Sequence, residues 1–344
     1  MRGASLRQFG TNFLGPVGVF FCEQLAQQKE PLYFLAREGY FLERMYQEYQ
    51  QAIGQNSKSH FMLASRAFMF RLLLDDDRSY EFSLKGQFSG SFYDLLRTRF
   101  MISNATIQQY FDKKIQTTFI SLPNDYEKVS KLLNSQAKLL GKIIAPTKSA
   151  YLAYLQSIGL TEQTTLNIVD LGYSGTIQKL LSLLLEKPSN GHYLIASKPG
   201  LNYVYGQTAA MKGYLKESVS MGDGYLPLDR SMFLEALLTS PNGQFQDIRH
   251  SPLPHGDFEY YYGRKVNAQK YIHELEQVMQ GAIDYVIHAA KHQVSFTANE
   301  VEQTLNQHVA KPNMIPRALW PLFTIDDDVA GNGTVDPLQF FGLR

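Results

Sequence analysis

The sequence predicts an α/β protein with a mainly parallel sheet, a large helical insertion and a helical C-terminal region. Short apolar runs, each followed by a polar turn and then by helical periodicity, occur twice near the N-terminus and again after residue 165. Residues 75–160 carry helical periodicity with little strand character, and a long helical pattern begins near Val266. Short strands that alternate with helices are typical of parallel sheets covered by helices.

The domain organisation follows from these patterns. We expect an α/β core made of residues 1–74 and 161–262, a mainly helical insertion of residues 75–160, and a helical C-terminal region with a loop-rich tail, residues 263–344. At 344 residues, with 44% hydrophobic and 19% charged residues, the chain is long and apolar enough to bury a sizeable core.

Local apolar patterns predict the individual elements. Apolar runs predict strands, polar turns end them, and a 3–4-residue apolar spacing predicts the helices that follow. Strands are predicted at residues 32–35, 61–64, 166–169, 191–197 and 209–215, and helices after residues 39, 67 and 176, at 230–240 and at 267–292.

Charge and cysteine content exclude several classes of function. Lysine and arginine (33) nearly balance aspartate and glutamate (32), so no overall positive field attracts nucleic acid. The single cysteine, Cys22, is predicted to be buried in a helix, and one cysteine allows neither an intrachain disulfide nor a cysteine-based zinc site. The apolar stretch 13–22 is far shorter than the roughly 20 residues of a transmembrane helix, and no signal-peptide pattern opens the chain. We therefore expect a cytoplasmic protein.

Three polar turns follow predicted strands, at residues 36–39, 65–66 and 170–176. Ligands of parallel sheets bind at the carboxyl ends of the strands, so these turns are expected to converge on one crevice. The third turn, in "LNIVDLGYSGTIQ", is rich in glycine and hydroxyl groups and leads into a helix, a combination that binds phosphate.

Two enzyme classes match this turn incompletely. An S-adenosylmethionine-dependent methyltransferase would carry an acid after the next strand to bind the ribose, but "GHYLIAS" ends in Ala196-Ser197. A haloacid-dehalogenase-type phosphatase needs a second carboxylate where this chain has Gly172. The aspartates of "LLLDDDR" and "FTIDDDVAGNGT" lack the spacing of that motif, and we expect them to be surface acids at helix ends and turns.

A third interpretation is a loop that binds phosphoribosyl pyrophosphate (PRPP). Asp170 stands at the end of the strand, where it can hold ribose hydroxyls, and the turn offers backbone N–H groups and hydroxyls to the 5-phosphate. Arg37 and Arg66 follow the two earlier strands. Guanidinium groups match phosphate oxygens, so these two side chains are candidates for binding pyrophosphate.

Five short blocks, in this order, resemble the glycan phosphoribosyltransferase module of bacterial ribofuranosyltransferases and capsule polymerases. They are "GTNFLGPV" (10–17), "YFLAREGYFL" (33–42), "LASRA" (63–67), "IVDLGYSGTIQ" (168–178) and "FLEALLTSPNG" (233–243). The resemblance covers roughly residues 5–245 and implies a phosphoribosyltransferase-like fold. The family more often has Asp where this chain has Glu38.

The resemblance implies transfer of 5-phosphoribose from PRPP to a hydroxyl of a growing surface glycan, such as O-antigen or capsule. A haloacid-dehalogenase-type phosphatase or another glycosyltransferase domain, in cis or in trans, is the implied partner, and it would remove the 5-phosphate. Mg²⁺ is expected to arrive with PRPP near Asp170 rather than on a dedicated set of side-chain ligands. Such partners could hold the protein at the inner membrane.

Each predicted site residue has an expected role in catalysis or in binding the donor. A general base would deprotonate the acceptor hydroxyl, and Glu38 and Glu235 are both candidates. The predicted catalytic residues are Glu38, Glu235 and Asp170, and the predicted donor-binding residues are Arg37, Gly39, Ser65, Arg66, Gly172, Tyr173, Ser174, Gly175 and Thr176. Three alternatives stay open: a nucleobase-type phosphoribosyltransferase, a methyltransferase, and a non-catalytic PRPP-binding module.

Overall fold

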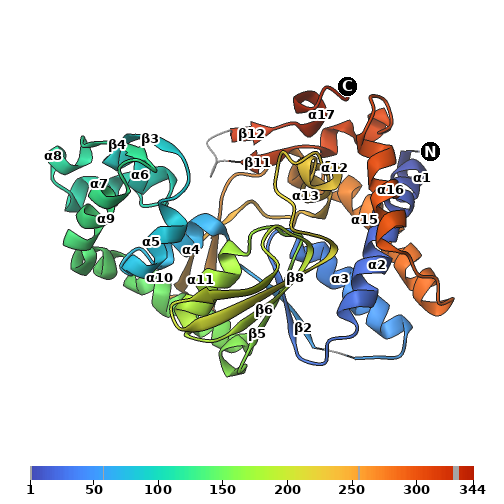
Figure 1. Cartoon of the computed structure of the whole chain (residues 1–344), viewed down its shortest axis with the longest axis horizontal. Coiled ribbons are helices and arrows are strands. Elements are labelled where there is room, and N and C mark those ends of the chain that lie inside the picture. Colours follow the sequence, from blue (N-terminus) through green and yellow to red (C-terminus); the bar gives the residue numbers. More distant parts are fainter. Residues whose placement is uncertain (1, 57, 255, 328–332) are drawn as a thin grey trace.

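The computed structural model describes residues 2–56, 58–254, 256–327 and 333–344. Its centre is a six-stranded sheet with strand order β2-β1-β5-β6-β8-β7, parallel except for the edge strand β7 (Figure 1). The predicted α/β class with a mainly parallel sheet is confirmed. The strands are β1 (Leu32–Leu35), β2 (Ser59–Met62), β5 (Leu166–Asp170), β6 (Ser189–Ala196), β7 (Gly200–Val204) and β8 (Gln207–Glu217).

The second strand was predicted two residues too late, at 61–64 instead of Ser59–Met62. The ladder ends at Met62 because side chains bind the backbone of Leu63: its N–H donates to the Tyr154 hydroxyl at 2.9 Å, and its carbonyl accepts from the Tyr151 hydroxyl at 2.9 Å.

Strand β7 was not predicted. It pairs with β8 through a tight turn at Tyr205-Gly206, where both residues have positive φ (45° and 88°). Tyrosine rarely adopts this conformation, so the turn has no typical sequence pattern. Leu201 and Tyr203 of β7 are exposed, which also weakens the apolar pattern.

The sheet separates two apolar cores. Phe34 and Val169 face a core formed with helices α2 (Gly15–Leu25), α3 (Gly39–Ala52) and α15 (Ile272–Lys291). Their neighbours Tyr33 and Ile168 face the other core, with α4 (Arg66–Leu72), α10 (Ala137–Ser157) and α11 (Thr176–Leu185). Because side chains alternate along a strand, both faces are apolar, and the molecule has three layers.

The order of the strands creates a switch point between β1 and β5. From β1 the chain crosses through α3 to β2 on one side, and from β5 it crosses through α11 to β6 on the other side. Right-handed crossovers in opposite directions place the two helices on opposite faces of the sheet. Both helices therefore begin at the same crevice, above the carboxyl ends of β1 and β5.

Residues 75–160 lie to one side of the sheet in Figure 1 and are mainly helical, with one short antiparallel pair, β3–β4. Their elements are η2 (Asp77–Ser79), α5 (Tyr80–Ser83), β3 (Phe88–Ser91), α6 (Phe92–Thr98), α7 (Asn104–Tyr110), α8 (Lys113–Gln116), β4 (Phe119–Leu122), α9 (Tyr126–Ser135) and α10, with η3 (Leu160–Glu162) leading back to β5.

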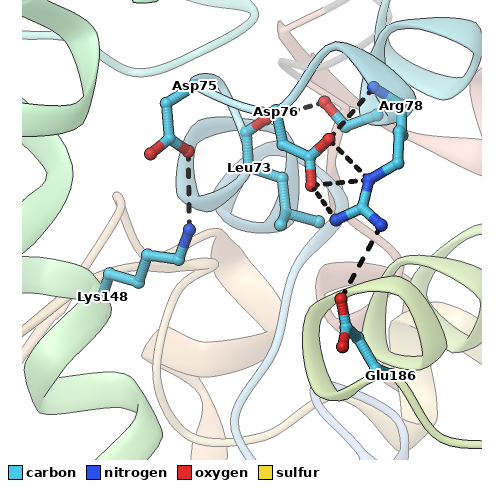
Figure 2. A network of polar contacts seen from close by, with 7 residues as sticks. Leu73, Asp75, Asp76, Arg78, Lys148 and Glu186 are labelled. Atoms are coloured by element: carbon cyan, nitrogen blue, oxygen red, sulfur yellow. Dashed lines mark hydrogen bonds and ion pairs between the residues drawn. The ribbon is translucent and has the colours of Figure 1, made fainter. Parts of the chain in front are cut away.

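A polar network surrounds the start of this segment, and one of its ion pairs, Arg78 with Glu186, reaches the core (Figure 2). Asp75 pairs with Lys148 of α10 at 3.5 Å, and Arg78 pairs with Asp76 at 2.7 Å and with Glu186, just after α11, at 3.8 Å. Asp75 and Asp76 thus lie at a helix end and a turn, as predicted, but their side chains are only 26% and 18% exposed rather than at the surface. Partly exposed pairs of this kind contribute little energy, so we interpret the network mainly as an alignment of the two parts.

Helix α15 packs against the N-terminal helices and α3. Thr11 donates a hydrogen bond to the Gly281 carbonyl of α15 at 3.0 Å, and Cys22 is buried in the shared core, as predicted. In the part of the chain that the structure describes, no helix is long and apolar enough to cross a membrane. The remaining elements are α1 (Arg2–Phe9), η1 (Gly10–Leu14), α12 (Leu226–Asp229), α13 (Met232–Leu238), β9 (Phe245–His250), β10 (Phe258–Tyr262), α14 (Asn267–Lys270), α16 (Ala298–Val309), η4 (Arg317–Leu322), β11 (Ile325–Asp327), β12 (Gly333–Val335) and α17 (Pro337–Phe340).

Candidate active site

A pocket of about 220 Å³ lies above the switch point. The turns after β1, β2 and β5 all contribute to its wall, so the expected convergence of the three polar turns is confirmed. A fourth wall comes from α13 and from the C-terminal region. The lining residues are Leu35–Glu38, Ala64–Arg66, Asp170–Ile177, Tyr193, Glu235, Gln244, Ile325 and Asp326.

Gly39 is the one predicted site residue outside this wall. It is buried at the start of α3, where its Cα packs against the main chain of Phe34 and leaves no room for a side chain. All other predicted residues line the pocket: Arg37, Glu38, Ser65, Arg66, Asp170, Gly172, Tyr173, Ser174, Gly175, Thr176 and Glu235.

The loop from Asp170 to Thr176 offers donors to an anion. Gly175, with φ of 67°, precedes α11 and provides no side-chain cap, so the first N–H groups of this ten-residue helix stay free at the pocket. The hydroxyls of Ser174 and Thr176 lie 3.1 Å apart beside them. Glu38 likewise provides no side-chain cap to α3. The N-terminus of α11 therefore favours negative charge in the pocket, whereas the first residues of α3 do not line it and the Tyr40 N–H donates to the Arg37 carbonyl at 3.3 Å.

The close approach of this loop to β6 gives a testable expectation. Gly172 has φ of 156°, and a Cβ there would lie 2.5 Å from the Ile195 carbonyl oxygen, which belongs to the sheet backbone. We expect Gly172→Ala to lower the free energy of unfolding by at least about 2 kcal/mol, because backbone cannot move aside as a side chain can. Urea unfolding measures this. An alanine variant as stable as the wild type would show that the loop is not held against β6.

Two cations in the pocket have no partner among the described residues. The guanidinium groups of Arg37 and Arg66 make no hydrogen bond or salt bridge there, whereas Arg71 pairs with Asp247 at 3.1 Å. Ser65, which precedes Arg66, caps α4 by accepting from the Phe68 N–H at 3.2 Å, and donates to the Phe245 carbonyl at 2.7 Å. The turn that carries Arg66 is thus fixed, and its charged group is available to a ligand.

Four carboxylates line the pocket with these cations: Glu38, Asp170, Glu235 and, at the C-terminal side, Asp326. Burial raises the pKa of Asp170 well above its usual range, and the charges of Glu38 and Glu235 raise it further. Burial and Glu38 also raise the pKa of Glu235, against the opposing effect of Arg37. Carboxylates that lie close together in a site with little water repel one another, and they therefore bind a proton or a cation more readily.

Glu235 is held by two hydroxyl groups. Tyr173 Oη and Ser231 Oγ each donate to Glu235 Oε1 at 3.1 Å. Tyr173 therefore has a polar role, since its hydroxyl joins the loop of residues 170–176 to helix α13. The helix at 230–240 was predicted, but which of its faces is buried was not, and Ser231 was missed.

A buried network supports the start of α11. Tyr193 donates to Gln178 Oε1 at 2.8 Å, and Gln178 Nε2 donates to the Ala210 carbonyl at 2.9 Å and to Ser189 Oγ at 3.0 Å. Tyr193 was missed in the sequence, although it pairs with Asp170 in the sheet register and therefore lies next to the loop. Gln178 fixes the helix that presents the free N–H groups.

The pocket wall formed by Gln244, Ile325 and Asp326 was also missed. From its turn-like surroundings we expected Asp326 to be a surface acid, and this prediction was wrong. Its side chain is only 3% exposed and pairs with Arg264 at 2.7 Å. The rest of that acidic turn, residues 328–332, lies outside the described residues.

No group of three or more His, Cys, Asp or Glu side chains in the described ranges is arranged to hold a metal ion. The convergent carboxylates of Asp170 and Glu38 nevertheless suit a divalent cation that takes its other ligands from bound phosphates. Comparison with protein-family models gives no match, and no curated protein is significantly similar to the chain. The site must therefore be interpreted from its own chemistry.

Proposed function

We propose that this chain is a PRPP-dependent phosphoribosyltransferase that moves 5-phosphoribose to a hydroxyl of a bacterial surface glycan. The observation that carries the proposal is the meeting, at one switch point, of two arginines without a partner among the described residues, the uncapped N-terminus of α11 and a cluster of carboxylates. A phosphorylated sugar that carries both a monophosphate and a leaving pyrophosphate fits this set. The sheet then corresponds to a phosphoribosyltransferase-like core.

Each part of the donor has a complementary group. The 5-phosphate would bind the N–H groups and hydroxyls of residues 172–176, and the pyrophosphate would bind Arg37 and Arg66. Asp170, at the end of β5, would bind ribose hydroxyls. Mg²⁺ bound near Asp170 and Glu38 would neutralise charge on the leaving pyrophosphate.

The reaction is a substitution at C1 of the ribose. The bond from C1 to the pyrophosphate oxygen breaks, and pyrophosphate leaves with the electron pair as the acceptor oxygen bonds to C1. Glu235 would take the proton of the acceptor hydroxyl, because two hydroxyl groups hold its carboxylate in the pocket wall and burial raises its pKa toward neutral pH. The product keeps its 5-phosphate, which a separate phosphatase of the haloacid-dehalogenase type would remove.

The alternatives fit less well. Strand β6 lies beside β5 and ends at Ala196 without a carboxylate for the ribose of S-adenosylmethionine. A nucleobase-type phosphoribosyltransferase shares the donor chemistry and differs in its acceptor, so base-exchange assays separate it. A non-catalytic PRPP-binding module would bind the donor without turnover.

Thermal unfolding with PRPP and Mg²⁺ tests donor binding, with S-adenosylmethionine and UDP-sugars as comparison ligands. A ligand at about 100 times its dissociation constant adds roughly 2.7 kcal/mol to stability, which shifts the midpoint visibly. We expect PRPP with Mg²⁺ to stabilise the protein and the comparison ligands to leave its midpoint unchanged. Stabilisation by S-adenosylmethionine or a UDP-sugar instead would contradict the proposal.

Arg37→Gln and Arg66→Gln are each expected to weaken PRPP binding about 10- to 100-fold, because each removes a charged hydrogen bond worth about 1.5–3 kcal/mol. Calorimetric titration of PRPP–Mg²⁺ measures the loss. Arg249→Gln is the matched control, since Arg249 pairs with Asp247 at 2.8 Å and does not line the pocket. Unchanged affinity in both pocket variants would show that pyrophosphate binds elsewhere.

A further inference from the structure

One wall of the pocket has no role in the proposed binding of the donor. It is formed by Gln244 and by Ile325 and Asp326 of the C-terminal region, and we call it the C-terminal wall. Gln244 lies between α13 and β9, where its carbonyl accepts from the Gly263 N–H at 2.8 Å, and Ile325 and Asp326 belong to β11. Helix α13, which carries Glu235, packs against β11. This wall therefore adjoins the proposed general base.

The polar groups of this wall are held in place, but some of their hydrogen-bonding atoms have no partner among the described residues. Arg264 donates to Asp326 Oδ1 from Nε at 3.1 Å and from Nη2 at 2.7 Å. In the described ranges, Oδ2 of Asp326 and the side-chain amide of Gln244 make no hydrogen bond. The wall thus offers a carboxylate oxygen that accepts and an amide that both donates and accepts.

The charge of this wall differs from that of the phosphate-binding turns. At those turns, Arg37 and Arg66 have no carboxylate partner within hydrogen-bond distance, which suits phosphate. At the C-terminal wall, Asp326 contributes a carboxylate whose Oδ1 accepts from Arg264, and Gln244 contributes an uncharged amide. A carboxylate oxygen and an amide bind the hydroxyl groups of an uncharged sugar, and the negative charge of the carboxylate disfavours a second phosphate.

We propose that Gln244 and Asp326, with Asp326 oriented by Arg264, form the acceptor subsite and bind hydroxyl groups of a neutral sugar. This inference rests on the proposed function. It places the acceptor between the C-terminal wall and Glu235, so that the hydroxyl that bonds to C1 can give its proton to that carboxylate. Gln244 and Asp326 are specificity-determining residues, and Arg264 is a positioning residue.

The test measures pyrophosphate release from PRPP–Mg²⁺ with methyl β-D-glucopyranoside, methyl β-D-galactopyranoside and methyl β-D-ribofuranoside as acceptors. We expect at least one glycoside to stimulate release by the wild-type protein. Gln244→Ala and Asp326→Asn should raise the KM of that glycoside about tenfold and leave the KM of PRPP within about twofold. Asp336→Asn is the matched control, because Asp336 pairs with Arg344 at 2.8 Å in the same region but does not line the pocket.

Other outcomes separate the two proposals. If PRPP neither stabilises the wild-type protein nor is turned over, the proposed function fails, and the acceptor subsite fails with it. If PRPP is bound and turned over but no glycoside stimulates release, only the subsite is overturned. It is also overturned if both variants keep the wild-type acceptor KM, or if the 6-phosphate of methyl glucopyranoside is preferred over the uncharged glycoside.

Discussion

Replacing Glu235 with glutamine is expected to lower kcat by about two to four orders of magnitude at saturating PRPP–Mg²⁺, which is the usual contribution of a general base. Glutamine keeps the size of the side chain and an oxygen that can accept from Tyr173 and Ser231, so the fold should persist. The measurement is pyrophosphate release with a saturating acceptor, beside the thermal shift caused by PRPP. We expect the shift to survive while turnover is lost.

Glu38→Gln is the matched variant, because Glu38 is the other candidate base and lines the same pocket. We expect it to retain more activity than Glu235→Gln. Near-normal turnover in Glu235→Gln combined with a large loss in Glu38→Gln would reverse the assignment. Near-normal turnover in both would show that neither is the base.

The pH dependence of kcat tests the assignment of Glu235 as the general base. A base acts only when ionised, so kcat should fall as the pH decreases through the pKa of Glu235. Glu38 raises that pKa and the hydrogen bond from Ser231 lowers it. Glu38→Gln should therefore move the acidic limb of the profile to lower pH, and Ser231→Ala should move it to higher pH. Identical limbs in all three proteins would exclude Glu235 as the titrating group.

Asp170→Asn should remove stabilisation by PRPP and reduce turnover at least about 100-fold, yet make the ligand-free protein more stable at pH 8. Because the pKa of Asp170 is raised in the folded state, the folded protein binds a proton that the unfolded chain releases. Stability then decreases as the pH rises above about 3.9, the ordinary value for aspartic acid. Asparagine cannot ionise and avoids this loss.

Thermal unfolding at pH 5 and pH 8, with and without PRPP–Mg²⁺, measures both effects. We expect the midpoint of the ligand-free variant to exceed that of the wild type by a few degrees at pH 8 and by less at pH 5. Asp76→Asn is the control of opposite sign: although burial opposes it, hydrogen bonds from Arg78 lower the pKa of Asp76, so its loss should destabilise the protein at pH 8 (Figure 2). A persistent PRPP shift in Asp170→Asn would place the ribose elsewhere.

Local sequence patterns were enough to predict that the three polar turns line one side of the pocket. The turns after β1, β2 and β5 are short, and each follows its own strand, so a parallel sheet necessarily brings them to one edge. Ser231, Gln244 and Asp326 could not be predicted in this way. Gln244 and Asp326 line the pocket, and Ser231 contacts Glu235, through packing between segments distant in sequence, such as β11 against α13, which has no periodic pattern.

Helix α15 has a consequence for how the protein comes into being. The sheet face that carries Phe34 and Val169 shares its core with Val278 and Ala282 of this helix. A nascent chain that has emerged from the ribosome up to the end of β8 already contains the three polar turns of the pocket. The apolar sheet face that α15 covers in the complete protein is still exposed at that stage. Assembly must wait for the C-terminal region to emerge, and a fragment that ends before α15 should aggregate or bind chaperones.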